Sequence, residues 1–117
     1  MSYLTATDID IYSGDSLNLQ VTVTDSTTNL PKSLIGVLSA RWWFGKKAGQ
    51  PATVQKSIGS GVTIIDAING RLDILINPSD TASLKGSYVH ELELVDASNR
   101  VQTVMAGAFT IIEDLVV

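Results

Sequence analysis

The sequence of 117 residues contains no cysteine, a single histidine and few charged residues, which make up 17% of the chain. The lack of cysteine excludes a disulfide framework, a thiolate nucleophile and a cysteine-ligated zinc site. The lone histidine, His90, excludes a metal site built from two histidines. The net charge of −4 argues against a protein that binds nucleic-acid phosphates, since such binding requires a basic surface.

Long apolar runs are also missing, and no stretch approaches the roughly 18 residues that would span a bilayer. Residues 1–6 lack the basic start and apolar stretch of a signal peptide, so we expect a soluble protein made in a cytoplasm. Hydrophobic residues nevertheless make up 44% of the sequence, which favours a packed core over disorder. We expect one domain over residues 1–117, with a short N-terminal arm and a C-terminal tail.

Apolar and polar residues alternate with a period of two along most of the chain, which is typical of strands with one buried face. The alternation and the turn residues between its segments predict strands over residues 8–11, 17–24, 37–44, 54–58, 62–65, 71–76, 87–96 and 100–112. Asn69-Gly70 predicts a tight hairpin turn, and Ser79 or Asp80 begins a single helical turn. We therefore predict an all-β sandwich or small barrel of roughly seven or eight strands.

Two details of these strands concern the core. Adjacent Trp42 and Trp43 must point to opposite faces of one strand. Trp42 shares its alternation with Leu38, Ala40 and Phe44, so we predict that it is a structural core residue and that Trp43 is an interface anchor. In the neighbouring segments, Leu34 is expected to plug the edge of the core, and Gly107 to mark a bulge or a close backbone contact.

Residues 84–88 (Leu-Lys-Gly-Ser-Tyr), followed by Leu92, Leu94 and Asp96, resemble the corner before strand F of immunoglobulin-like domains. The resemblance implies that the Tyr88 hydroxyl donates a hydrogen bond to upstream backbone and pins the connection between two sheets. The expected fold is then all-β, an immunoglobulin-like antiparallel β-sandwich of about seven or eight strands.

An ordered series of motifs covers about residues 8–112. It comprises residues 10–15 (Asp-Ile-Tyr-Ser-Gly-Asp) before the alternation of residues 17–23, Leu30-Pro31, Trp42, Gly70-Arg71-Leu72, Gly86-Ser87-Tyr88, and residues 96–101 before residues 107–111. In this order the motifs resemble small immunoglobulin-like virion proteins of tailed bacteriophages. Similar sequences form the N-terminal domain of phage baseplate upper proteins and free-standing small proteins on phage particles.

This resemblance implies a non-enzymatic structural protein, present in many copies and bound to other virion proteins of the capsid, tail or baseplate. Because the sequence has no portion after Val117 comparable to the rest of a baseplate upper protein, we expect a capsid decoration or connector protein. Attachment of a baseplate or tail fibre is the alternative. The expected location is the virion after synthesis in the bacterial host cytoplasm, and the resemblance implies no catalytic residues and no cofactor.

Two features predict the surface that touches neighbouring virion proteins. The C-terminal residues 113–117 end in an apolar stretch, which either extends the last strand or docks on another chain. Residues 45–51 form a lysine-bearing loop in an acidic protein. The loop lacks the glycine and lysine spacing of a phosphate-binding loop. The residues expected to bind partners are Trp43, Lys46, Lys47, Leu115, Val116 and Val117.

Groups of carboxylates suggest two further sites, each with a simpler explanation. Asp8, Asp10 and Asp15 could ligate calcium, but carboxylates at a sheet edge also discourage aggregation, and we favour that interpretation. Glu91 and Glu93 share one strand face like a glycosidase pair, yet a flat sheet exterior provides no cleft for a substrate.

Two other classes of function compete with a structural role. A carbohydrate-binding module would stack sugar rings on Trp43, Tyr12 or Tyr3, and would show coplanar exposed aromatic rings on one sheet face. A small hydrolase would need His90 beside a nucleophile, and the sequence has no Gly-x-Ser-x-Gly motif. We expect His90 to be a strand residue with a hydrogen-bonded ring.

Overall fold

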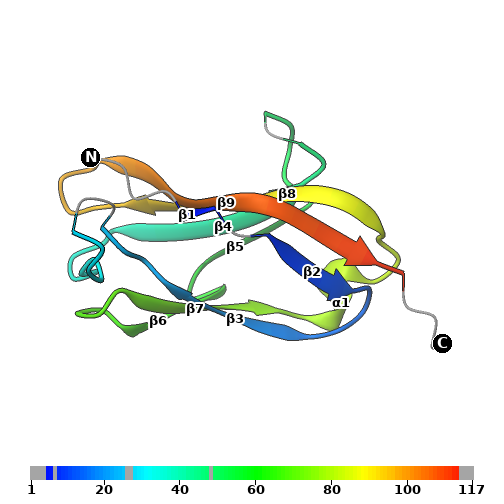
Figure 1. Cartoon of the computed structure of the whole chain (residues 1–117), viewed down its shortest axis with the longest axis horizontal. Helices are drawn as coiled ribbons and strands as arrows, with labels where there is room; N and C mark the ends of the chain where they lie inside the picture. The colour runs from blue at the N-terminus through cyan, green and yellow to red at the C-terminus, as the bar shows by residue number, and fades with distance from the viewer. Residues whose placement is uncertain (1–4, 7, 26–27, 48, 114–117) are drawn as a thin grey trace.

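The computed structural model describes residues 5–6, 8–25, 28–47 and 49–113 as a nearly all-β chain (Figure 1). Its strands are β1 (Thr5–Ala6), β2 (Ile9–Tyr12), β3 (Leu17–Thr22), β4 (Ser39–Gly45), β5 (Val54–Ile58), β6 (Gly61–Asp66), β7 (Arg71–Ile76), β8 (Gly86–Val95) and β9 (Val101–Ile112). One helical turn, α1 (Pro78–Thr81), connects β7 to β8. The all-β prediction is confirmed, and each predicted strand has a counterpart. No helix of the described part is long and apolar enough to cross a bilayer.

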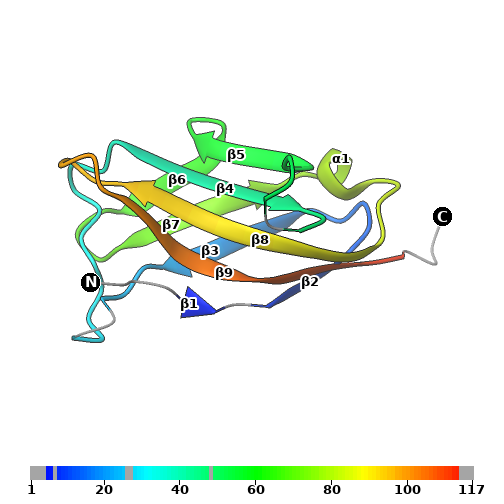
Figure 2. The ribbon, with the colours of Figure 1, turned by 90° about the horizontal axis from the view of Figure 1, so that it is seen from above.

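The strands form the two layers of an immunoglobulin-like sandwich (Figures 1 and 2). One layer has the order β9, β8, β4, β5, with β1 and β2 both pairing with β9, and the other has the order β3, β7, β6. The expected antiparallel pairing holds in the interior of both layers. At the edges it does not, because β1 and β2 run parallel to β9, and β5 meets β6 in a short parallel contact that links the layers.

Aromatic rings fill the centre of the sandwich. Trp42 and Phe44 on β4 are completely buried, as is Phe109 on β9. The Phe44 and Phe109 rings stack with centroids 4.6 Å apart, and Trp42 meets the Phe109 ring edge-on at 5.7 Å. Leu34 is 2% exposed and closes one end of this core. The predicted burial of Trp42 and Leu34 is therefore confirmed.

The alternation fails before β4. Leu38 was expected to share the buried face of Trp42, but it is 58% exposed. The strand begins at Ser39, and Leu38 belongs to the preceding loop, where its N–H donates to the Val95 carbonyl at 2.7 Å. A residue outside the strand does not follow the strand's alternation, and Val37 packs against the core in its place.

The alternation also shifts within β9. Met105 pairs with Leu92 and Thr103 pairs with Glu93, so Val104 is an extra residue in the ladder. This bulge lets Val104 and Met105 both be buried, while Val101 at the start of the strand is 62% exposed. Gly107, the residue at which a bulge was considered, pairs regularly with His90.

The hairpin predicted at Asn69-Gly70 is present between β6 and β7. Gly70 has a φ of 70°, a left-handed conformation that favours glycine. A Cβ atom at this position would lie 2.5 Å from the Lys32 carbonyl oxygen and 2.7 Å from the Val23 carbonyl oxygen. Glycine therefore allows the turn to pack directly against the backbone of the loop before β4.

An ion pair joins α1 to β5. The Lys56 side chain points inward from β5 and its Nζ lies 2.7 Å from Asp80 Oδ2, with both side chains largely buried. The same carboxylate oxygen accepts the Asn77 N–H at 2.7 Å, which caps the start of α1. A Cβ at Gly61 would lie 2.6 Å from Lys56 Cδ, so glycine at this position makes room for the lysine.

Candidate functional site

Trp43 lies half-buried on the outer face of β4, opposite to Trp42 as predicted. Its neighbours across the strands are Gln55 on β5 and Glu91 on β8. Next to it, Arg41 forms an ion pair with Glu93. We call this outer surface the Trp43 face. It contains an open depression of about 290 Å³ lined by Arg41, Trp43, Ala52, Gln55 and Glu93.

The lysine loop lies at one end of β4, and Lys46 does not join the Trp43 face. The Lys46 Nζ lies 4.3 Å from the centre of the Tyr88 ring, a cation–π contact over a core residue. Lys46 and Lys47 are both exposed. Leu115, Val116 and Val117, also expected to bind partners, lie outside the described residues. Partner binding by these residues stays a prediction.

Tyr88 is 4% exposed and meets the Phe44 ring edge-on at 5.5 Å, so it is a core residue. In the part of the chain that the structure describes, its hydroxyl makes no hydrogen bond with upstream backbone, which differs from the expected corner. Thr81 fixes this corner instead. Its carbonyl accepts from Ser13 Oγ and its hydroxyl accepts the Gly14 N–H, both at 2.9 Å. Thr81 thereby ties the connection between β7 and β8 to the turn after β2.

His90 is 1% exposed and packs among the central rings. The Trp42 Nε1–H donates to His90 Nδ1 at 3.1 Å. Because Nδ1 is the acceptor, the neutral ring carries its proton on Nε2. The expectation of a strand histidine with a hydrogen-bonded ring is confirmed.

The aspartates considered for calcium lie on and near β2. The Asp8 carboxylate accepts the Ala108 N–H at 3.0 Å, and Asp10 points to solvent between buried Ile9 and Ile11. Across the described residues, no group of three or more His, Cys, Asp and Glu side chains could hold a metal ion.

The aromatic residues considered for sugar binding do not form a shared platform. Tyr12, 51% exposed, lies on the outer face of β2, where it pairs with Ile112 of β9. Trp43 pairs with Glu91 of β8, which in turn pairs with Ala106 of β9. Ala106 and Ile112 lie six positions apart along β9, a distance of about 20 Å. Tyr3 lies outside the described residues.

One feature was not expected from the sequence, a set of exposed aliphatic side chains in the loops and strand ends at one end of the sandwich. At this end lie the loop before β4, the turn between β6 and β7 and the turn between β8 and β9 (Figure 1). Six aliphatic side chains at this end are each 58–68% exposed: Leu30, Ile35, Leu38, Ile65, Ile68 and Val101. We call this surface the apolar end. A possible signal was apolar residues within turns, such as Ile35 before Gly36 and Ile68 before Asn69. Because these residues lie in turns and not in strands, the alternation of apolar and polar residues does not predict whether they are buried.

Hydrogen bonds hold the loops of the apolar end together. The Leu34 N–H donates to the Ala67 carbonyl at 2.7 Å, which joins the loop before β4 to the turn between β6 and β7. In that turn, the Asn69 side-chain amide holds the pKa of Asp66 below its ordinary value. In the turn between β8 and β9, the Arg100 N–H lowers the pKa of Asp96 in the same way.

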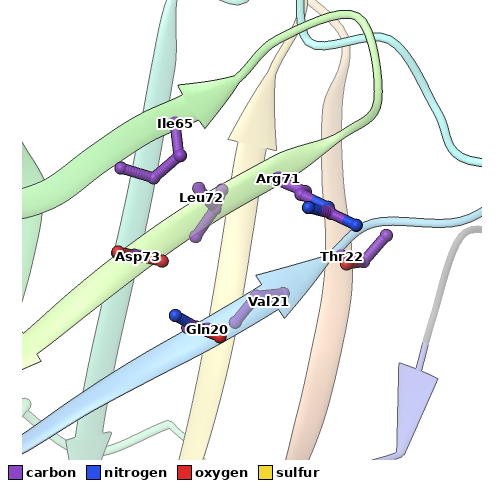
Figure 3. Close-up of a pocket in the computed structure, with 7 residues that line it drawn as sticks. All are labelled: Gln20, Val21, Thr22, Ile65, Arg71, Leu72 and Asp73. Carbon is purple, nitrogen blue, oxygen red and sulfur yellow. The ribbon is translucent and has the colours of Figure 1, made fainter.

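The other layer has an open depression of about 350 Å³ on its outer face (Figure 3). Arg71 extends from β7 toward Thr22 on β3, and Ile65 borders the depression from β6. The remaining lining residues are two polar and two apolar ones, Gln20 and Asp73 and Val21 and Leu72. This depression spans β3, β7 and β6.

A scan against protein-family models and a search of curated proteins found no match for this chain. Among solved structures, the chain is similar to AggA, the major subunit of aggregative adherence fimbriae type I from Escherichia coli. The sequences are 13% identical, the match covers 91% of this chain and 89% of AggA, and the TM-score is 0.31. The description of the fold therefore depends on the strand order and register given above.

Proposed function

We propose that this chain is a non-enzymatic structural protein of a tailed-phage particle, a capsid decoration or connector protein that binds neighbouring virion proteins. The resemblance of its ordered motifs to small phage virion proteins suggests the particle. The observation that carries a binding role is the apolar end, because large apolar side chains exposed together at one end of a domain are typical of protein–protein interaction sites.

The apolar end is a better primary contact than the Trp43 face. Six exposed aliphatic side chains are available there, and burying each contributes on the order of 1 kcal/mol or more. The Trp43 face offers one half-buried tryptophan beside charges that are already paired. Many copies on a symmetric lattice would strengthen even a modest contact of this kind through avidity.

The first experiment is mass spectrometry of purified phage particles. We expect peptides of this chain in stoichiometric excess over contaminating host proteins. Their absence from particles that are otherwise complete would show that the chain is not a virion component.

The second experiment tests the surface. The double variant Ile35→Ser/Ile68→Ser removes two side chains of the apolar end, each 68% exposed. We expect its copy number on particles to fall at least about tenfold, while its stability changes by less than about 0.5 kcal/mol. The control is Leu75→Ser, which removes a 46% exposed aliphatic side chain from the outer face of β7. Equal incorporation of both variants would place the contact elsewhere.

A further inference from the structure

Strand β3 has a free edge. It is the last strand in its layer, and β7 is the one described strand with which it pairs. Figure 3 shows the segment of Gln20 and Thr22 with β7 on one side and no strand of the same layer on the other. The Val23 N–H donates to the Gly70 carbonyl on the β7 side. Because backbone groups alternate in an antiparallel pair, those of Asn18, Gln20 and Thr22 point away from β7.

The other edges of the sandwich have features that oppose pairing with another chain. The inward-pointing charge of Lys56 lies on β5, and Ile65 forms a bulge in β6. Asp10 lies on β2, with Asp8 just before it. Strand β3, with the sequence Leu-Asn-Leu-Gln-Val-Thr, contains no charge, proline or bulge. It is therefore the edge best suited to accept another strand.

The side chains of β3 also leave apolar surface to be covered. Leu17, Leu19 and Val21 point inward but are only half-buried, because none of the described strands lies beyond them. A groove of about 120 Å³ runs beside Leu19 and Val21, and Val104 and Met105 of β9 form its opposite wall. A strand added at this edge would cover the groove and these three side chains.

We propose that the occupant of this edge is β3 of a second copy of the chain, paired antiparallel about a two-fold axis. The sequence of β3 is complementary to itself in this arrangement. When the axis passes beside Leu19 or Gln20, apolar residues face apolar residues on the inner side, and Asn, Gln and Thr face one another on the outer side. The two three-stranded layers then become one sheet of six strands.

The six residues of β3 carry no charge that would oppose this pairing, even though each copy has a net charge of −4. On the outer faces of β3 and β7 the one carboxylate is Asp73, which accepts a hydrogen bond from Asn18 Nδ2 at 3.2 Å. Two β3 strands would separate the two Asp73 residues by about 14 Å, which exceeds the screening length of about 8 Å at physiological salt. An uncharged edge therefore matches another uncharged edge.

The contact is small, since a pair of six-residue strands buries well below the roughly 1,200 Å² of a stable interface. We therefore expect a weak dimer that forms at high concentration or where copies are held close together. This inference does not depend on the phage assignment.

Two measurements on the intact chain test the inference, sedimentation velocity over about 10 μM to 1 mM and amide hydrogen exchange at both ends of that range. We expect a reversible dimer, with protection of the Asn18, Gln20 and Thr22 amides that rises with concentration. The amides of Leu19 and Val21 point toward β7 and serve as internal controls, since their protection should not depend on concentration.

The matched variants are Gln20→Lys at the edge and Thr63→Lys on the outer face of β6. We expect Gln20→Lys to weaken dimerisation at least about tenfold, because two lysines would meet near the axis, and Thr63→Lys to leave it unchanged. A chain that stays monomeric at 1 mM would overturn the inference. So would a dimer in which Gln20→Lys has no effect or in which the three outward amides stay unprotected.

Discussion

The hydrogen bond between Trp42 and His90 is a polar contact in the centre of an aromatic core. Both side chains are buried, and the Trp42 Nε1–H has His90 Nδ1 as its acceptor at 3.1 Å. A buried donor without a partner loses its hydration without compensation. His90 is therefore a structural residue that makes it possible to bury tryptophan, rather than phenylalanine, at this position.

We predict that His90→Leu lowers the free energy of unfolding by about 2–3 kcal/mol, because Trp42 Nε1–H loses its acceptor. His90→Gln, whose side-chain oxygen can accept the same bond, should cost less. Urea unfolding of the two variants measures the difference. Equal stability of His90→Leu and the parent protein would show that the bond contributes nothing.

Tyr88 allows the corner to be tested at a single atom. Because its hydroxyl makes no hydrogen bond with upstream backbone among the described residues, Tyr88→Phe should change the unfolding free energy by less than about 0.5 kcal/mol. Thr81→Val keeps the shape but removes the hydroxyl that accepts the Gly14 N–H, and it should cost about 1–2 kcal/mol. A larger loss of unfolding free energy for Tyr88→Phe than for Thr81→Val in chemical denaturation would show that the tyrosine hydroxyl fixes the corner.

At the scale of elements, the pair of Lys56 and Asp80 joins β5 to α1 across the end of the sandwich. Removing one partner of a buried pair leaves a charge without compensation. We predict that Asp80→Ala lowers stability by about 3 kcal/mol, since it also removes the acceptor of the Asn77 N–H. Lys56→Met should lower it less. Additive losses in the double variant would mean that the two side chains are not coupled.

The turn between β8 and β9 predicts a dependence of stability on pH. The Arg100 N–H, followed by the Ser98 N–H, lowers the pKa of Asp96 in the folded chain. A lowered folded pKa means that this stabilisation is present above about pH 4 and is lost as the pH falls through the folded value.

Asp96→Asn should therefore be less stable than the parent protein at pH 7, and the difference should shrink from pH 5 to pH 2. Urea unfolding at several pH values measures this. Asp10→Asn, at an exposed position on β2, is the control. If the unfolding free energy falls equally steeply between pH 5 and pH 2 in the parent protein and in Asp96→Asn, the prediction is contradicted.

At the scale of the whole molecule, the two layers share one core. Trp42, Phe44 and Phe109 of one layer belong to the same cluster of buried residues as Leu72 and Ile74 of the other. We therefore predict one cooperative thermal transition with an unfolding enthalpy of about 80 kcal/mol near 60 °C. Far-ultraviolet circular dichroism and tryptophan fluorescence should give the same midpoint. Separate midpoints would show that the layers unfold independently.

The sequence alone determined the positions of the strands and the identity of the central core residues. Alternation and turn residues are local properties, because each strand needs one apolar face regardless of which strand lies beside it. For this reason the burial of Trp42, the outward direction of Trp43 and the hairpin near Gly70 could be predicted.

Only the tertiary structure decided the features that depend on which strands become neighbours. The bulge at Val104 follows from the pairing of β8 with β9, and the corner is held by Thr81 because the turn after β2 packs there. The apolar end forms because loops far apart in the sequence meet at one end of the sandwich. The free edge of β3 exists because β2 pairs with β9 instead. The strand's own residues do not specify that choice, because contacts between distant segments determine it.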